Sequence, residues 1–155
     1  MTIKPSKHKF HLLLHSADLI QEYLSVKLLT LGITSSQARV IKALNHLGKT
    51  SQIDLAKEFD ITAASMSTMT GRLTALGFIA TQKDPVNAKR NLLSLTPRGI
   101  AIIDDIEMAW ASVDEYIQAR IGKEKQHTLA ELTQELRDSL GGRKPDKKPI
   151  IKPNK

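Results

Sequence analysis

The 155-residue chain predicts a mainly α-helical fold with one small β-hairpin. Apolar residues recur at steps of three and four in most segments, which is the spacing of one face of a helix. Two short β-compatible runs, 78–83 and 91–95, are separated by DPVNAKR, in which Asp-Pro favours a turn. Apolar residues make up 41% and charged residues 25%, close to the globular average, so the chain can bury the core of one domain.

Three helices are predicted before residue 61. The first spans residues 10–31 with apolar residues at helical steps, and Gly32 suits a C-terminal cap. The sequence TSSQ at 34–37 then reads as a capping box, and a second helix follows with an apolar side. A third, short helix begins within 50–54 and is interrupted at Asp60.

Residues 62–77, TAASMSTMTGRLTALG, have the small and hydroxyl-bearing composition of either a flexible linker or a helix. Met66, Met69, Leu73 and Leu76 are spaced three, four and three residues apart, which a linker has no reason to maintain. We therefore predict a helix over 63–76 with Thr62 as its N-cap. The opposite face of this helix carries small and hydroxyl side chains and one full charge.

The hairpin and two long helices complete the prediction. Thr96 suits an N-cap and Pro97 the first position of a long helix, and a last helix follows Gly122. The apolar seams of these helices are Ile103, Ile106, Trp110, Val113 and Ile117 in one, and Leu129, Leu132, Leu136 and Leu140 in the other.

The order of helix 51–59, helix 62–76 and hairpin 78–95 is that of a winged helix-turn-helix, whose second helix enters the major groove of duplex DNA. Short hydroxyl side chains can reach phosphates or bases, and small residues let the helix backbone sit deep in the groove. The predicted DNA-binding residues are Thr62, Ser65, Ser67, Thr68, Thr70, Arg72, Lys83, Lys89 and Arg90. The alternative is that these residues form a solvated helix face and a solvated turn.

The distribution of charge is more informative than the net charge of +7. Residues 49–98 hold seven basic and four acidic residues, a net +3, whereas residues 99–140 hold four and nine, a net −5. The basic middle coincides with the predicted helix-turn-helix and hairpin. Aromatic residues are only 4% of the chain, which argues against single-strand binding by base stacking and favours duplex DNA.

The run from Thr62 to Gly99 resembles the MarR (multiple antibiotic resistance regulator) family. The similar pieces are a hydroxyl-led recognition helix ending RLTALGFI and the segment DPVNAKRNLLSLTPRG, which matches that family's wing with its leucine-threonine-x-x-glycine ending. The resemblance implies a transcriptional regulator, expected to be a repressor. It would bind a pseudo-palindromic operator as a homodimer whose first and last helices interlock. It also implies a small, often aromatic or anionic, effector bound between the dimerisation helices and the DNA-binding lobe, although no residue of this chain identifies that ligand.

The wing departs from the family pattern at its tip. The family carries an aspartate and, two residues later, an arginine, where this chain has Asn87 and Lys89, with Arg90 adjacent. We therefore expect the Asp–Arg pair that braces the wing to be missing. Lysine also lacks the planar fork of arginine, which weakens the expectation that Lys89 enters the minor groove.

The predicted organisation follows from these pieces. Residues 34–96 form the DNA-binding lobe, 10–33 and 97–140 form dimerisation helices, and 1–9 and 141–155 are disordered basic ends. The long apolar helices exceed what a winged domain of about eighty residues needs for its own core, so we expect them to form a subunit interface. The alternative use is a helical cap within one chain.

Other classes of protein are disfavoured. The chain lacks cysteine, a phosphate loop and any nucleophile–base pattern, so we expect no enzyme, no cofactor and no metal site. It lacks a membrane-spanning or signal segment, so we expect a cytoplasmic protein. Two rival functions stay open: a protein-interaction module on a winged-helix scaffold, and a metal-responsive sensor using His8, His11 and His15, which share a helix face.

Overall fold

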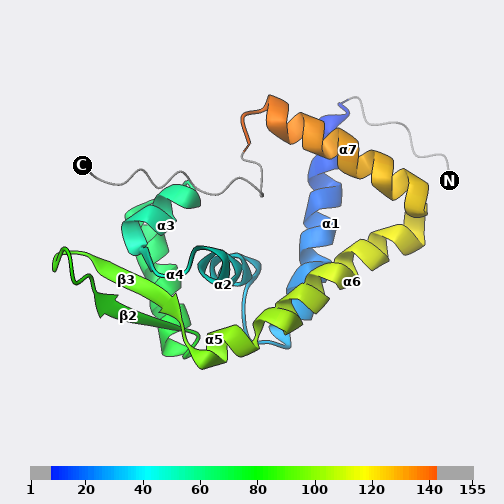
Figure 1. Ribbon diagram of the computed structural model, residues 1–155. Helices are drawn as coiled ribbons and strands as arrows, with labels where there is room; N and C mark the ends of the chain where they lie inside the picture. The colour runs from blue at the N-terminus through cyan, green and yellow to red at the C-terminus, as the bar shows by residue number, and fades with distance from the viewer. Residues whose placement is uncertain (1–7, 143–155) are drawn as a thin grey trace. The chain divides into compact units, whose positions relative to one another are not determined.

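The computed structural model describes residues 8–142, so the predicted disordered ends, 1–9 and 141–155, lie almost entirely outside the described residues. The chain divides into two compact units, Met1–Val113 and Asp114–Lys155. The first unit holds most of the helices and the sheet, with the hairpin projecting from one end (Figure 1). No helix within the described range is long and apolar enough to cross a membrane.

The mainly helical prediction is confirmed, with the elements in the expected order. The helices are α1 (Phe10–Leu29), α2 (Ser35–Leu47), α3 (Gln52–Glu58), α4 (Ala63–Ala75), α5 (Pro97–Ala101), α6 (Ile103–Ile121) and α7 (Lys123–Ser139). The strands are β1 (Thr50–Ser51), β2 (Ile79–Lys83) and β3 (Asn91–Leu95).

Local capping sets the start of the helices in the lobe formed by residues 34–96. At α2 the predicted capping box is complete: the Gln37 amide donates to Thr34 Oγ1 at 3.2 Å, and the Thr34 amide donates to Gln37 Oε1 at 2.9 Å. Thr62 caps α4 and Thr96 caps α5 in the same way, each accepting from the amide three residues on. These caps satisfy amides that a helix leaves unpaired at its N-terminus, so short polar residues position these helices.

The sheet is larger than the predicted two-stranded wing. β2 and β3 form the predicted hairpin, and β1 adds a third antiparallel strand in the order β1-β3-β2. Thr50 pairs with Leu93 and Ser51 pairs with Leu92. Thr50 and Ser51 lie in the segment 50–54, within which the sequence predicts the start of a helix. Ser51 ends this strand and also caps α3, so the helix begins two residues later than Thr50.

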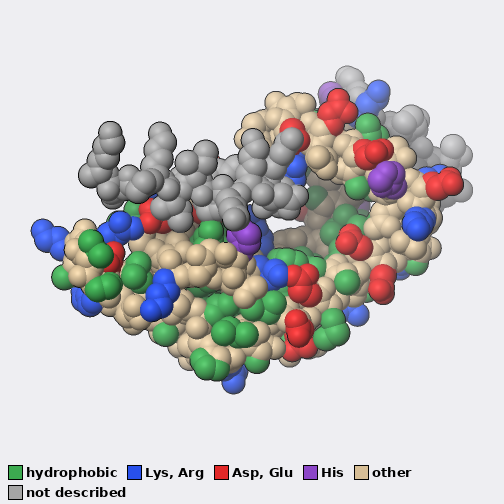
Figure 2. Space-filling model, viewed as in Figure 1, with side chains coloured by type: hydrophobic (Ala, Val, Ile, Leu, Met, Phe, Trp, Pro, Cys, Tyr) green, Lys and Arg blue, Asp and Glu red, His purple; other side chains and the backbone are tan. Residues whose placement is uncertain are grey.

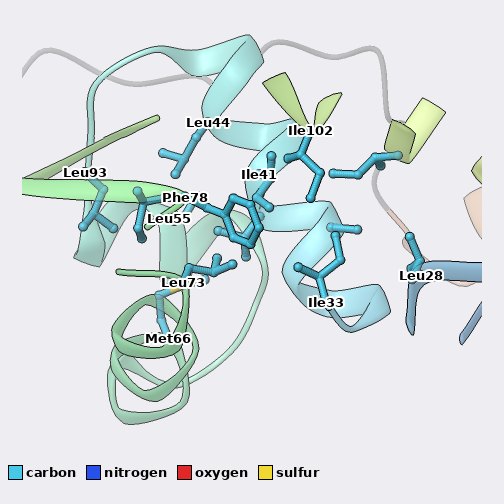
Figure 3. Close-up of a cluster of buried hydrophobic side chains, with 14 of the residues drawn as sticks. Leu28, Ile33, Ile41, Leu44, Leu55, Met66, Leu73, Phe78, Leu93 and Ile102 are labelled. Carbon is cyan, nitrogen blue, oxygen red and sulfur yellow. The ribbon is translucent and has the colours of Figure 1, made fainter. Parts of the chain in front are cut away.

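One continuous core joins α2, α3, α4 and the sheet. Figure 3 shows its side chains converging from these elements, with Leu28 of α1 and Ile102 beside them. The largest fully buried side chains are Leu28, Val40, Ile41, Leu44, Leu55, Met66, Leu73, Ile79, Leu93 and Ile106. Because this core includes both helices of the helix-turn-helix and the root of the wing, it holds the parts of the lobe in one rigid arrangement.

The segment after the wing differs from the single long helix predicted from Thr96 onward. It forms α5 and α6, separated at Ile102, whose φ and ψ are −83° and −9°. Gly99 in α5 lies against the start of the wing: a Cβ at this position would be 2.0 Å from the Phe78 carbonyl oxygen. Thr96 Oγ1 also donates to Gly77 O at 2.6 Å. Thr96 and Gly99 of the LTPRG sequence therefore hold α5 close to Gly77 and Phe78, the residues just before strand β2.

Candidate nucleic-acid interface

Helix α4 presents a polar face beside the core of the lobe. Met66 and Leu73 are buried with 0% exposure, whereas Ser65, Ser67, Thr68 and Arg72 are exposed. The sequence produces this division because its larger apolar residues keep one helical face and its small hydroxyl residues the other. Ser65, Ser67, Thr68 and Arg72, all predicted to bind DNA, are thus exposed outside the buried face of α4.

The hydroxyl groups on α4 differ in what they can offer a ligand. Thr62 Oγ1 accepts from the Ser65 amide at 3.1 Å and donates to Ser65 Oγ at 2.9 Å, so Thr62 acts as a cap. Thr68 Oγ1 donates to the Ala64 carbonyl at 3.1 Å, which leaves its oxygen as an acceptor. Ser67 makes no side-chain hydrogen bond to any other described residue. Ser65 and Ser67 can therefore donate to an anion without breaking an internal bond.

Thr70 is among the predicted DNA-binding residues, and the structure corrects this prediction because it buries Thr70 in α4. It is only 3% exposed, and its hydroxyl donates to the Met66 carbonyl at 2.9 Å. Thr70 follows Met66 by four residues and precedes Leu73 by three, so it lies on the buried face of α4. This spacing was available in the sequence and identifies Thr70 as a core residue whose hydroxyl is satisfied by its own helix.

The tip of the wing is shaped by two short polar turns. The Val86 amide donates to Asp84 Oδ1 at 2.8 Å, and the Lys89 amide donates to Asn87 Oδ1 at 3.1 Å. Lys83 and Lys89 are exposed, as predicted, and Val86 at the tip is 93% exposed. Figure 2 shows Lys and Arg side chains gathered around the end of the hairpin. The tip is therefore a hydrogen-bonded turn that carries exposed lysines.

Arg90 is directed away from this tip, contrary to its predicted role. Its Nη2 lies 2.6 Å from Asp54 Oδ2 in α3, and its side chain is 28% exposed. Asp54 Oδ2 also accepts from Ser51 Oγ at 2.7 Å. An Asp–Arg pair therefore does link the wing to α3, with the arginine in the wing and the aspartate in α3.

A groove of about 460 Å³ lies between the N-terminus of α2 and the exposed face of α4. It is lined by Thr34, Ser36, Gln37, Ser65, Thr68, Met69 and Arg72. The sequence did not predict Thr34, Ser36 and Gln37 as site residues, although its capping box at Thr34 marks a helix N-terminus. Such a terminus favours anions, and the groove joins it to the positive charge of Arg72.

The histidine cluster does not assemble a metal site. His11 and His15 are exposed on α1, and the His8 and His11 rings lie 6.0 Å apart, centre to centre. Among residues 8–142, no group of three or more His, Cys, Asp or Glu side chains is placed to hold a metal ion. The structure therefore lends no support to the metal-sensor alternative.

Comparison with known proteins shows which family this lobe is similar to. The model of the MarR family matches residues 31–90. A Thauera aromatica protein, whose name assigns it to regulation of the hcr operon, is 24% identical over 127 residues, which cover 82% of this chain and 76% of that protein.

Solved structures share the fold. A mutant of MarR from E. coli complexed with operator DNA superimposes with a TM-score of 0.72 at 19% identity, covering 81% of this chain and 91% of that one. BpsR from Bordetella bronchiseptica, whose DNA binding is regulated by 6-hydroxynicotinic acid, gives a TM-score of 0.74 at 21% identity, covering 89% and 99%. Residues 31–90, which hold the helix-turn-helix and the wing up to Arg90, match the model of the MarR family, and the chain has the winged-helix fold of the solved MarR structures.

Proposed function

We propose that this protein is a transcriptional repressor that binds a pseudo-palindromic operator in duplex DNA as a homodimer. The observation that carries the proposal is the exposed polar surface of α4, where Ser65, Thr68 and Arg72 line one groove, in a lobe that also carries a basic wing. A helix with small side chains can approach the floor of the major groove closely. The groove at the N-terminus of α2 adds amide groups suited to a backbone phosphate.

The homodimer is supported by apolar surface that each unit leaves exposed. In the first unit, α1 exposes seven large apolar side chains: Phe10, Leu12, Leu13, Leu14, Leu19, Val26 and Leu29. In the second unit, α7 buries none of its side chains within the described range, and it exposes Leu129, Leu132 and Leu136. Helices with so little intrachain burial need a partner surface, and a second copy of the chain offers the same faces by symmetry.

An effector is proposed on the comparison alone. DNA binding by BpsR is regulated by 6-hydroxynicotinic acid, a small aromatic acid. We propose that a small aromatic or anionic molecule likewise relieves binding by this protein.

The proposal is tested by measuring binding to the DNA upstream of the protein's own gene over a range of salt concentrations. Phosphate contacts release counterions, so we expect log affinity to fall linearly with log salt, with a slope that counts the contacts. Genome-wide footprints should then show inverted half-sites about one helical turn apart. Binding that is weak, insensitive to salt and without such half-sites would favour a protein-interaction module.

Arg72→Ala tests α4 as the reading helix. Arg72 is exposed and its side chain has no hydrogen-bond or ion-pair partner among residues 8–142, so its loss should leave the fold intact. If Arg72 contacts a base edge, the variant should lose about 1–3 kcal/mol of operator affinity. Lys125→Ala in α7 removes the same charge outside the lobe and serves as the matched control in the same titration. Equal affinities for the two variants would rule out Arg72 as a base-reading residue.

A further inference from the structure

The connection between the wing and the helix-turn-helix is built around Arg90. The β1–β3 ladder ends at the Ser51–Leu92 pair, and Arg90 lies two residues before Leu92. From there its Nη2 reaches Asp54 Oδ2 at 2.6 Å, 36 residues back in the chain. The ion pair therefore extends the attachment of the wing past the last backbone pair.

The partner of Arg90 is itself held in place. Asp54 lies in the first turn of α3, where its amide donates to Ser51 Oγ at 3.1 Å and its Oδ2 accepts from that hydroxyl at 2.7 Å. Its side chain is 34% exposed, so the carboxylate is partly withdrawn from water. A carboxylate held in this way gives the guanidinium a fixed target, which a freely rotating surface carboxylate would not.

Arg90 also closes the turn that carries Lys89. Its carbonyl accepts from the Asp84 amide at 3.0 Å, and its amide donates to the Asn87 carbonyl at 2.8 Å. Lys89 and Val86 lie beyond this point in the turn. Any swing of the turn against α3 must therefore strain or break the Arg90–Asp54 pair.

We propose that Arg90 is a positioning residue: with Asp54 and Ser51 it fixes the wing on the helix-turn-helix, and Lys83 and Lys89 make the wing's contacts to DNA phosphates. This inference rests on the proposed DNA-binding function and assigns different roles to the arginine and the lysines of the wing. A wing fixed in advance loses little conformational freedom on binding, so its contacts contribute more of their energy to affinity. A wing whose arginine is engaged with α3 follows the DNA backbone with lysines and does not read the minor groove with an arginine fork.

Asp54→Asn and Arg90→Met separate this role from direct contact. If Arg90 contacts DNA, Arg90→Met should weaken binding and reduce the salt slope by about one contact, whereas Asp54→Asn should strengthen binding because it removes a negative charge. If Arg90 positions the wing, both variants should weaken binding by a similar factor, roughly five- to tenfold, and the double variant should be no weaker than either single one. The salt slope should stay at the wild-type value in all three.

Lys89→Met and Lys125→Ala serve as controls in the same titrations. Lys89→Met should lower the salt slope by about one, because it removes a phosphate contact, and Lys125→Ala should change neither quantity. Unaltered or stronger binding by Asp54→Asn, with a reduced slope for Arg90→Met, would overturn the positioning role.

A measurement without DNA keeps the inference independent of the proposed function. Hydrogen exchange followed by NMR at the Asp84 and Arg90 amides, which close the turn, reports opening of the wing. In Asp54→Asn we expect these two amides to exchange about tenfold faster, with amides of α4 unchanged. Unchanged exchange at Asp84 and Arg90 would overturn the brace even if the wild-type protein binds its operator. Faster exchange in a protein that binds no DNA would support the brace and reject the repressor.

Discussion

At the scale of single residues, two glycines of this chain have different structural roles. A Cβ on Gly99 would meet the Phe78 carbonyl oxygen at 2.0 Å and the Leu95 side chain at 3.2 Å. A Cβ on Gly71, in α4, would meet no described atom within 4 Å. Gly99 is therefore required by the close approach of two backbones, whereas Gly71 only adds flexibility to a helix.

Alanine at these two positions should change stability in opposite directions. Gly99→Ala should lower the free energy of unfolding by about 1–3 kcal/mol, because backbone atoms must move to make room. Gly71→Ala should raise it by about 0.5–1 kcal/mol, because alanine is the better helix former. Urea unfolding of both variants at one temperature measures the pair. A Gly99→Ala protein as stable as the wild type would show that α5 can move away from the wing at little cost.

At the scale of one element, α4 separates hydroxyls that serve the helix from hydroxyls that face outward. Thr70 is buried and donates to Met66 O, whereas Thr68 is exposed and donates to Ala64 O. Both lie in the segment that composition alone assigns to DNA contact. Only the helical phase relative to Met66 and Leu73 distinguishes them.

Valine substitutions test this division within α4. Thr70→Val keeps the volume and loses one hydrogen bond, so it should cost about 0.5–1.5 kcal/mol of stability and leave DNA affinity unchanged. Thr68→Val should leave stability within about 0.5 kcal/mol and weaken operator binding, because Thr68 lines the groove between α2 and α4. Thermal unfolding and fluorescence anisotropy on the same samples compare the two. A loss of affinity in Thr70→Val at unchanged stability would reverse the assignment.

At the scale of the whole molecule, the apolar residues left exposed by the two units suggest the assembly. Leu132 in α7 is 59% exposed and Leu29 in α1 is 75% exposed. Each leucine that a subunit interface buries completely contributes about 1.5–3 kcal/mol. The proposed homodimer would therefore be stabilised mainly by these exposed leucines of the long helices.

Leu132→Glu should disrupt that assembly. Burying a carboxylate in an apolar interface is unfavourable, so we expect the variant to sediment as a single chain where the wild type sediments as two. Its operator affinity should fall because one lobe binds only one half-site. Lys125→Glu, a charged replacement on the same helix, should still sediment as two chains. A wild type that sediments as a monomer would refute the dimer directly.

The sequence by itself determined what depends on neighbours within a few residues of the chain. Apolar spacing marked the helices, Thr34, Thr62 and Thr96 marked their starts, and Asp-Pro marked the hairpin, because caps, turns and helical faces are local interactions. The outward face of α4 followed from the same periodicity. The MarR resemblance rested on such local pieces and was confirmed by the family match over residues 31–90.

Only the tertiary structure determines the contacts between residues that are far apart in the sequence. Strand β1 forms because Thr50 and Ser51 pair with Leu93 and Leu92, about forty positions later in the chain. Arg90, predicted to contact DNA, instead forms an ion pair with Asp54, which lies 36 positions earlier. The need for glycine at position 99 likewise comes from Phe78 in the wing. Local propensity holds no information about these pairings, since their energy appears only when the core brings the two segments together.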